Sequence, residues 1–130
     1  MREFWDGNPE VVITQIRKQL ADYRFDYSTE SKMQEQVYSL LLPIVDCRRE
    51  VILSKRDRID LMTNCGIGIE CKVKGSAPVI VGQLLRYAEH DEVKALILVT
   101  SKRLHLTSQL FREQEVLGKP LFGLWVGANW

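Results

Sequence analysis

Three ionisable residues occupy positions in the sequence from which they could act together. Asp60 lies in one short apolar stretch, and Glu70 and Lys72 lie in the next. The polar and glycine residues 63–66 between the stretches predict the tight turn of a β-hairpin. Side chains two apart on a strand share a face, and a hairpin brings Asp60 close to Glu70. Two carboxylates and a lysine are therefore expected to converge.

The surrounding sequence predicts the elements that position these residues. Strands are predicted over residues 47–53, 57–62, 67–73, 94–100 and 120–126. Helices are predicted from Asn8 to about Tyr23, from Ser28 or Thr29 to Pro43, from Ser76 to about His90, and from about Leu106 to Leu117. The order α-α-β-β-β-α-β-α-β predicts an α/β fold, with a mixed central sheet and flanking helices.

Two of these strands have informative side-chain patterns. Strict alternation in the first strand of the hairpin predicts Asp60 on one face, with Ile59 and Leu61 together on the other. The run 94–100 is apolar almost throughout, which is typical of a strand buried on both faces. We expect it to lie in the middle of the sheet.

The order of elements and the three charged residues resemble the PD-(D/E)xK nuclease superfamily, which has the restriction-endonuclease-like fold. In that superfamily an acidic residue on the second strand and a Glu-x-Lys on the third form the active site. The matching residues are Asp60, Glu70 and Lys72, and Ile59 replaces the proline of the family pattern. The single domain 1–130 then comprises an N-terminal helical extension (1–27), the PD-(D/E)xK core (28–101) and a C-terminal helix and strand (102–130).

The resemblance implies a nuclease that depends on Mg²⁺ or Mn²⁺. A hard divalent ion held by carboxylates offsets the charge that builds up on a phosphate during hydrolysis. Mg²⁺ prefers oxygen ligands and keeps several waters, so two carboxylates and one backbone carbonyl suffice. The candidate ligands are Asp60, Glu70 and the backbone carbonyl of Cys71. Lys72 is the candidate for orienting the attacking water and stabilising negative charge.

The helix after the hairpin carries Gln83 and Tyr87, whose spacing of four places them on one helical face. This Gln-x-x-x-Tyr resembles the motif of the RecB-like and lambda-exonuclease-like branches of the superfamily. The likeness implies that Gln83 contacts a water at the metal site or the phosphate, and that Tyr87 supports Gln83 or binds substrate. The residues alone leave open that Gln83 is exposed and Tyr87 only packs.

The helix before the hairpin offers two further acidic candidates. Helical spacing places Glu30 on the side of the apolar residues Met33 and Val37, and Glu35 on the opposite side. Glu30 is therefore the candidate catalytic residue, and Gln34, on the same side, is a candidate for binding substrate. A glutamate at a helix N-terminus also favours the helix dipole, so a structural role for Glu30 stays open.

Composition and charge set broader limits. The 130 residues are 45% hydrophobic and 27% charged, enough for one core. The net charge is +1, but residues 1–46 carry five Lys/Arg and eight Asp/Glu, whereas residues 47–130 carry thirteen and nine. Arg58 and Lys74, near the hairpin, are candidates for binding a polyanion such as nucleic acid. The sequence contains no run of about 18 apolar residues, so no membrane-spanning helix is predicted. We expect a cytoplasmic protein.

Other chemistries have less support. His90 and His105 lack metal-ligand spacing, and each is expected at the surface. The three cysteines form no Cys-x-x-Cys, which favours reduced thiols over a zinc site or disulfides.

We therefore expect a metal-dependent nuclease that hydrolyses DNA phosphodiester bonds. Its partner is nucleic acid, with DNA favoured over RNA, and a homodimer would suit substrates with two strands to cut. Cutting of junctions or branched DNA is one form of the activity, and processive exonuclease action is another. The alternatives are a non-catalytic nucleic-acid-binding or assembly module that keeps the fold, and a structural ion-pair network in an unrelated protein.

Overall fold

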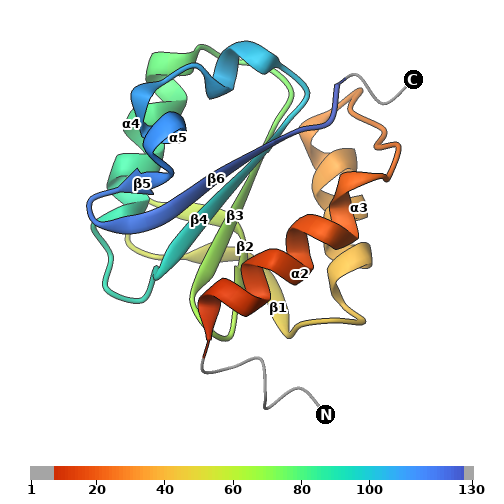
Figure 1. Cartoon of the computed structure of the whole chain (residues 1–130), viewed down its shortest axis with the longest axis horizontal. Helices are drawn as coiled ribbons and strands as arrows, with labels where there is room; N and C mark the ends of the chain where they lie inside the picture. The colour runs from red at the N-terminus through yellow and green to blue at the C-terminus, as the bar shows by residue number, and fades with distance from the viewer. Residues whose placement is uncertain (1–7, 128–130) are drawn as a thin grey trace.

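A six-stranded mixed sheet forms the centre of the fold in the computed structural model, which describes residues 8–127 (Figure 1). The strands are β1 (Cys47–Ile52), β2 (Arg58–Thr63), β3 (Ile67–Lys72), β4 (Ala95–Thr100), β5 (Glu115–Val116) and β6 (Lys119–Trp125), in the order β1-β2-β3-β4-β6-β5. The first three form an antiparallel meander, whereas β3, β4 and β6 run parallel and β5 is antiparallel to β6. The predicted α/β class and mixed sheet are confirmed.

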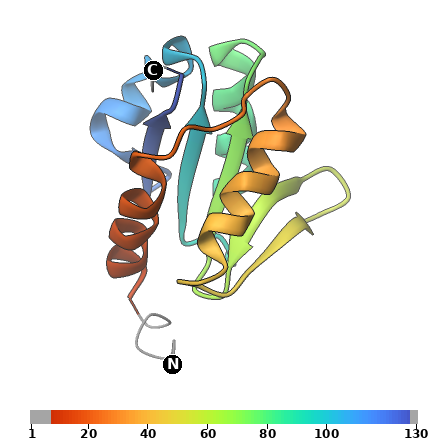
Figure 2. The same ribbon diagram turned by 90° about the vertical axis from the view of Figure 1, so that its right-hand side faces the viewer.

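Helices cover both faces of this sheet (Figure 1 and Figure 2). The helices α2 (Pro9–Ala21) and α3 (Glu30–Leu41) pack on one face through one shared apolar cluster, and α4 (Ala77–Ala88) packs on the other. Every residue of β4 is buried, and its side chains alternate between the two clusters, as predicted for a central strand. Within residues 8–127, no helix combines the length and apolar character needed to cross a membrane.

The three long helices begin where the sequence predicts. Asn8, Thr29 and Ser76 are the N-caps, and each side-chain oxygen accepts a backbone N–H from three residues further on. The donors are Val11, Lys32 and Val79. Local chemistry at these starts is therefore sufficient to locate them.

The C-terminal helix is much shorter than predicted. In place of one helix over residues 106–117, the chain forms a 3₁₀ helix η1 (Arg103–Leu106), then α5 (Gln109–Glu113) and β5. Gln114 ends α5 with a φ of 57°, a left-handed conformation that stops a helix. Val116 then pairs with Lys119 and is fully buried. Pairing with β6 and burial of Val116 outweigh the helical spacing.

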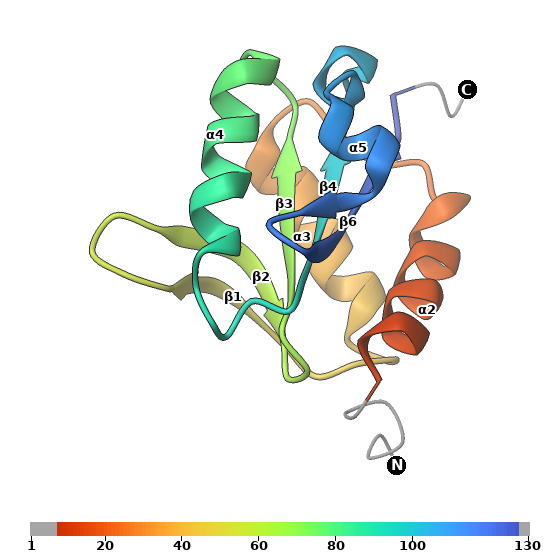
Figure 3. The same cartoon turned by 60° about the vertical axis from the view of Figure 1, so that its left-hand side comes forward.

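The outer part of the β1–β2 ribbon projects from the sheet beside α4 (Figure 3). We call this part, residues 51–59, the arm. Gly68 of β3 makes room for its base, because a methyl group at Gly68 would collide with Cδ1 of Ile59. The arm and the neighbouring helix α4 thus lie on the same side of the sheet as the Ile59 side chain.

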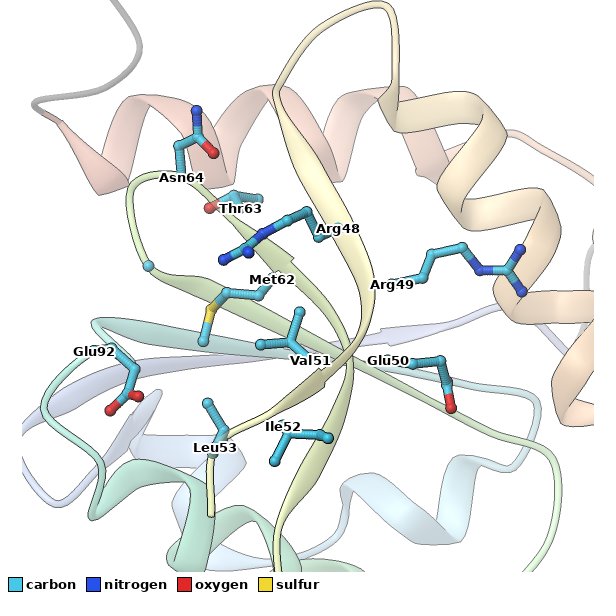
Figure 4. Close-up of a pocket in the computed structure, with 11 residues that line it drawn as sticks. Arg48, Arg49, Glu50, Val51, Ile52, Leu53, Met62, Thr63, Asn64 and Glu92 are labelled. Atoms are coloured by element: carbon cyan, nitrogen blue, oxygen red, sulfur yellow. The ribbon is translucent and has the colours of Figure 1, made fainter. Parts of the chain in front are cut away.

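A break in side-chain alternation accompanies this change of direction. Ile59 packs in the core on the α4 face, whereas Leu61 packs in the core on the α2–α3 face, so the prediction that they share a face is wrong. In β1 the consecutive residues Arg49 and Glu50 both hydrogen-bond Gln34 of α3 and lie on one side of the strand (Figure 4). Glu50 has a φ of 52°, outside the range of a regular strand.

Candidate functional site

Asp60 and Glu70 face each other at the point where β2 and β3 separate. The pairing of these strands covers Leu61 with Ile69 but does not extend to Asp60 and Glu70, the next residues in register. At this point side-chain oxygens accept the hydrogen bonds that backbone oxygens accept in a regular β-ladder. Oδ2 of Asp60 accepts a hydrogen bond from the Cys71 amide at 2.8 Å, and Oε1 of Glu70 accepts one from the Asp60 amide at 3.2 Å. The prediction that the hairpin brings these carboxylates together is confirmed.

Burial raises the pKa of both carboxyl groups. Glu70 is only 3% exposed, and the charge of Asp60 adds to the effect of burial, while Lys72 opposes it. For Asp60 burial is again the largest cause; the Cys71 amide and Lys72 lower its pKa, and the neighbouring Glu50 and Glu30 raise it. The site thus concentrates more negative charge than one lysine balances.

Of the two lysines that follow Glu70, only Lys72 points into the site. Its Nζ lies 3.3 Å from Oε2 of Glu70, and its side chain is 18% exposed. Lys74 lies beyond the end of β3, is exposed, and makes no hydrogen bond or ion pair with a described residue. Alternation along β3 places Lys72 beside Glu70, whereas Lys74 lies outside the site because the strand ends at Lys72.

The helix α3 approaches the site from the opposite face to α4. Oε2 of Glu30 accepts a hydrogen bond from the Val73 amide at 3.2 Å, whereas Glu35 is exposed. Gln34 is buried between two residues of β1: its Nε2 donates to Glu50 at 2.8 Å, and its Oε1 accepts from Arg49 Nε at 3.0 Å. Glu30 is thus directed at the end of β3, while the amide group of Gln34 is engaged by β1.

On the α4 face, Gln83 and Tyr87 form a chain of hydrogen bonds to β2. Nε2 of Gln83 donates to the Tyr87 hydroxyl at 2.7 Å, and that hydroxyl donates to the backbone oxygen of Arg58 at 2.8 Å. Burial, followed by the charges of Glu70 and Asp60, raises the pKa of Tyr87 far above its ordinary value. Tyr87 thus packs in the core and also joins Gln83 to β2, and its role in binding substrate stays a prediction.

The predicted substrate-binding residue Arg58 lies at the base of the arm. Its Nε is 3.2 Å from Oε1 of Glu50, and both side chains are exposed. Its guanidinium group is thus accessible to solvent while one edge is held by a carboxylate.

Glu50 is a residue of this site that the sequence analysis missed. The register of β1 and β2 places it opposite Asp60, between the pairs Arg49–Leu61 and Val51–Ile59. Its charge contributes to the raised pKa of Asp60. A carboxylate directly after two arginines was the only signal in the sequence, and charged residues on an edge strand are common.

A second buried carboxylate, Asp57, fixes the arm to α4. Its Oδ1 accepts a hydrogen bond from Arg86 Nε at 3.0 Å, and its Oδ2 lies 3.0 Å from His90 Nε2. The hydrogen bond with His90 is the largest cause of a lowered Asp57 pKa; burial opposes it and Arg86 reinforces it. His90, expected at the surface, is instead partly buried in this contact.

His105 is fully buried, so its predicted surface position is wrong. Its Nδ1 lies 2.6 Å from Oγ1 of Thr100, and its Nε2 lies 2.8 Å from the backbone oxygen of Gly75. Both ring nitrogens have partners, which makes burial of the ring tolerable. His105 thereby joins the segments that leave β3 and β4.

The oxygens of Asp60 and Glu70 that accept no backbone N–H are the groups best placed to hold a metal ion. No hydrogen bond from a described residue to Oδ1 of Asp60 is seen, and Oε2 of Glu70 lies 3.3 Å from Lys72 Nζ. Among residues 8–127, no three or more His, Cys, Asp or Glu side chains are grouped closely enough to hold a metal ion. A metal here would rest on two carboxylates and water, with the Cys71 carbonyl as the further predicted ligand.

Comparison with known proteins adds no relative: no protein-family model, curated protein or solved structure matches the chain.

Proposed function

We propose that the chain is a divalent-metal-dependent nuclease that hydrolyses phosphodiester bonds, in DNA before RNA. The observation that carries this proposal is the facing pair Asp60 and Glu70, with the Lys72 ammonium 3.3 Å from Glu70. Burying two like charges together costs free energy, and such pairs with raised pKa values cluster at functional sites. A frame-stabilising role would be served better by apolar residues at the same positions.

The donor set of this pair suits Mg²⁺ or Mn²⁺. Both residues offer carboxylate oxygens, the ligands that these hard ions prefer, and each has one oxygen that no backbone amide occupies. A bound divalent ion supplies positive charge to a phosphate and lowers the pKa of water. The repulsion between Asp60 and Glu70 is a further reason to place a cation between them.

The chain's own groups divide the remaining tasks. Lys72 orients the attacking water and stabilises the negative charge that develops on the phosphate. Glu30 fixes the end of β3 through the Val73 amide, next to Lys72. Gln83 and Tyr87 hold β2 behind Asp60 through the Arg58 backbone. These three side chains thus position the strands that carry the reacting groups.

Binding outside the reacting centre falls to the exposed cations Arg58 and Lys74, which can contact phosphates on either side of the cut. The homodimer stays a prediction.

A non-catalytic nucleic-acid-binding module is the second candidate. It is favoured by the closed ion pair between Lys72 and Glu70, in which the lysine already satisfies a carboxylate. In that case the pair would fix the geometry of β3 and the cations would bind nucleic acid.

Cleavage assays on labelled single-stranded, duplex, nicked and four-way-junction DNA, and on RNA, with Mg²⁺, Mn²⁺ or EDTA, test the proposal. Wild type should cleave only with metal, and Lys72→Ala should lose activity by about 10²–10⁴-fold, the usual contribution of a general acid or base. Lys18→Ala, an exposed lysine on α2, is the matched control and should cleave as wild type. Cleavage retained by Lys72→Ala contradicts the assigned site; binding without any cleavage favours the second candidate.

A further inference from the structure

A basic hollow of about 660 Å³ is lined by residues of the arm and of α4. The arm and α4 lie side by side in Figure 3. Four cationic side chains line the hollow, together with a single carboxylate, Asp57. The cations are Lys55, Arg56, Arg58 and Arg86. Such a surplus of positive charge in a concave site favours an anionic ligand.

Two of these cations have no acidic partner among residues 8–127. Asp57 is engaged by Arg86 and His90, and Arg58 is paired with Glu50. Lys55 and Arg56 are exposed and form no ion pair with a described residue. Their charges are therefore available to phosphate groups.

The loop that carries Lys55 and Arg56 is held in place by its own hydrogen bonds. Oγ of Ser54 accepts hydrogen bonds from the backbone amides of Arg56 and Asp57, each at 3.2 Å. The Leu53 amide donates to the backbone oxygen of Asp57 at 2.8 Å. Asp57 in turn is fixed to α4. The two cations thus sit on a pre-organised support, which lowers the entropic cost of binding.

Tyr87 links the hollow to the carboxylates, because it lines the hollow and its pKa is raised by burial and also by the nearby charges of Glu70 and Asp60. Gln83 also lines the hollow, and Tyr87 hydrogen-bonds the Arg58 backbone two residues before Asp60. The hollow therefore lies next to the segment of β2 that leads to Asp60.

Size and an apolar wall identify the ligand. A volume of about 660 Å³ lies within the range of small-molecule pockets, so the hollow has room for one nucleotide. Ile52, 74% exposed, lines the same hollow and offers an apolar surface to a base, which only an unpaired nucleotide presents. We propose that the hollow binds one unpaired nucleotide of a nucleic-acid strand next to the cut, so that the substrate is single-stranded at this position. This inference rests on the proposed function.

Binding measured in EDTA tests this without requiring cleavage. Fluorescence anisotropy with a labelled single-stranded 12-mer, as DNA and as RNA, and with the matching blunt duplex gives the affinity at several salt concentrations. Wild type should bind the single strand more tightly. Lys55→Ala and Arg56→Ala should each reduce the slope of log K against log salt by about 0.7, the value for one phosphate contact with a single strand. Lys18→Ala, on the opposite face of the sheet, should leave the slope unchanged.

The variant Ile52→Ser distinguishes the contribution of the base to binding from that of the phosphates. It should weaken binding of the single strand and leave duplex binding unchanged, and thermal melting checks that this variant, changed at an exposed position, is folded. Equal affinity for duplex and single strand, or unchanged salt slopes in both arm variants, overturns the inference. If these binding results hold while no metal gives cleavage, the nuclease proposal fails and the nucleotide site stands. Metal-dependent cleavage together with arm variants that bind as wild type supports the nuclease proposal and overturns the nucleotide site.

Discussion

The two halves of the sheet are built on different principles. In the parallel half, β3, β4 and β6 form continuous ladders, and β4 is buried along its whole length. In the other half, the β2–β3 ladder stops at Leu61 and Ile69, β1 contains a left-handed residue, and the arm leaves the sheet. Apolar burial holds the first half together, whereas in the second half charged and polar side chains add connections to those made by the buried residues Ile59 and Leu61.

This difference shows where a charged site can be placed in so small a fold. Where β2 and β3 separate, the backbone amides of Asp60 and Cys71 have no partner on the opposite strand's backbone. They donate instead to the carboxylates of Glu70 and Asp60, respectively. The parallel half is rigid enough to hold Glu70 and Lys72 on β3 despite the repulsion between Asp60 and Glu70. The frame and the site therefore make opposite contributions to stability.

Truncating one buried and one exposed apolar side chain is the strongest test of this division. Leu98→Ala in β4 removes a fully buried side chain and should lower the free energy of unfolding by about 2–5 kcal/mol, the cost of lost burial and a residual cavity. Ile52→Ala in the arm, 74% exposed, should change it by less than about 0.5 kcal/mol. Urea denaturation measures both. A large loss in the Ile52 variant would mean that the arm is part of the core.

Removing a charge from the site should stabilise the protein. The pKa of Glu70 is raised in the folded state, so its ionisation favours unfolding, and wild-type stability should fall as the pH rises from about 4.3, the value in an unfolded chain, to the raised folded value. The Glu70→Gln variant cannot ionise at this position, so it does not lose stability in this way as the pH rises. At pH 8 in EDTA it should be more stable than wild type by at least about 1.4 kcal/mol, the equivalent of one pKa unit.

The comparison across pH identifies the cause. The advantage of Glu70→Gln should nearly vanish at pH 4, where wild-type Glu70 is protonated in the folded state and mostly protonated in the unfolded state. Glu35→Gln on the exposed side of α3 should match wild type at both pH values. Denaturant midpoints at pH 4, 6 and 8 provide the measurement, and a Glu70→Gln variant that is less stable than wild type at pH 8 would show that Lys72 outweighs the effect of burial.

Sequence patterns predicted the parts of this molecule that local chemistry determines. Asn8, Thr29 and Ser76 identified helix starts because an N-cap depends on residues within one turn. The apolar run of β4 and the turn at 63–66 located the central strand and the hairpin. Since the hairpin register follows from its turn, the meeting of Asp60 and Glu70 was also predictable.

The features that the sequence did not predict depend on contacts between distant residues. His105 is buried because Thr100 and Gly75 satisfy its ring, and Val116 leaves the helical pattern because β6 offers a strand to pair with. The Ile59 side chain, on the other face from Leu61, occupies space that the absence of a side chain at Gly68 of β3 leaves open. Alternation along one strand contains no information about any of these partners.

The smallest expected effect concerns Glu50, where the irregular half departs furthest from regular strand geometry. Its φ of 52° costs an ordinary residue roughly 1–2 kcal/mol, a cost that glycine does not bear. Glu50→Ala and Glu50→Gly lose the same contacts with Gln34 and Arg58, so their difference in stability isolates the backbone. We expect the glycine variant to be the more stable by about 1 kcal/mol.

At Arg48, an exposed position of β1 where φ is not positive, the order should reverse, with glycine less stable than alanine by about 0.5–1 kcal/mol. Thermal unfolding of the four variants checks both differences. If the glycine variant is the less stable one at both positions, the left-handed conformation of Glu50 is imposed by its side-chain contacts and relaxes without them. In that event the arm should also lose its direction, because Glu50 lies at its base, opposite Asp60. Opposite orders place the origin of the bend in the backbone of β1 itself.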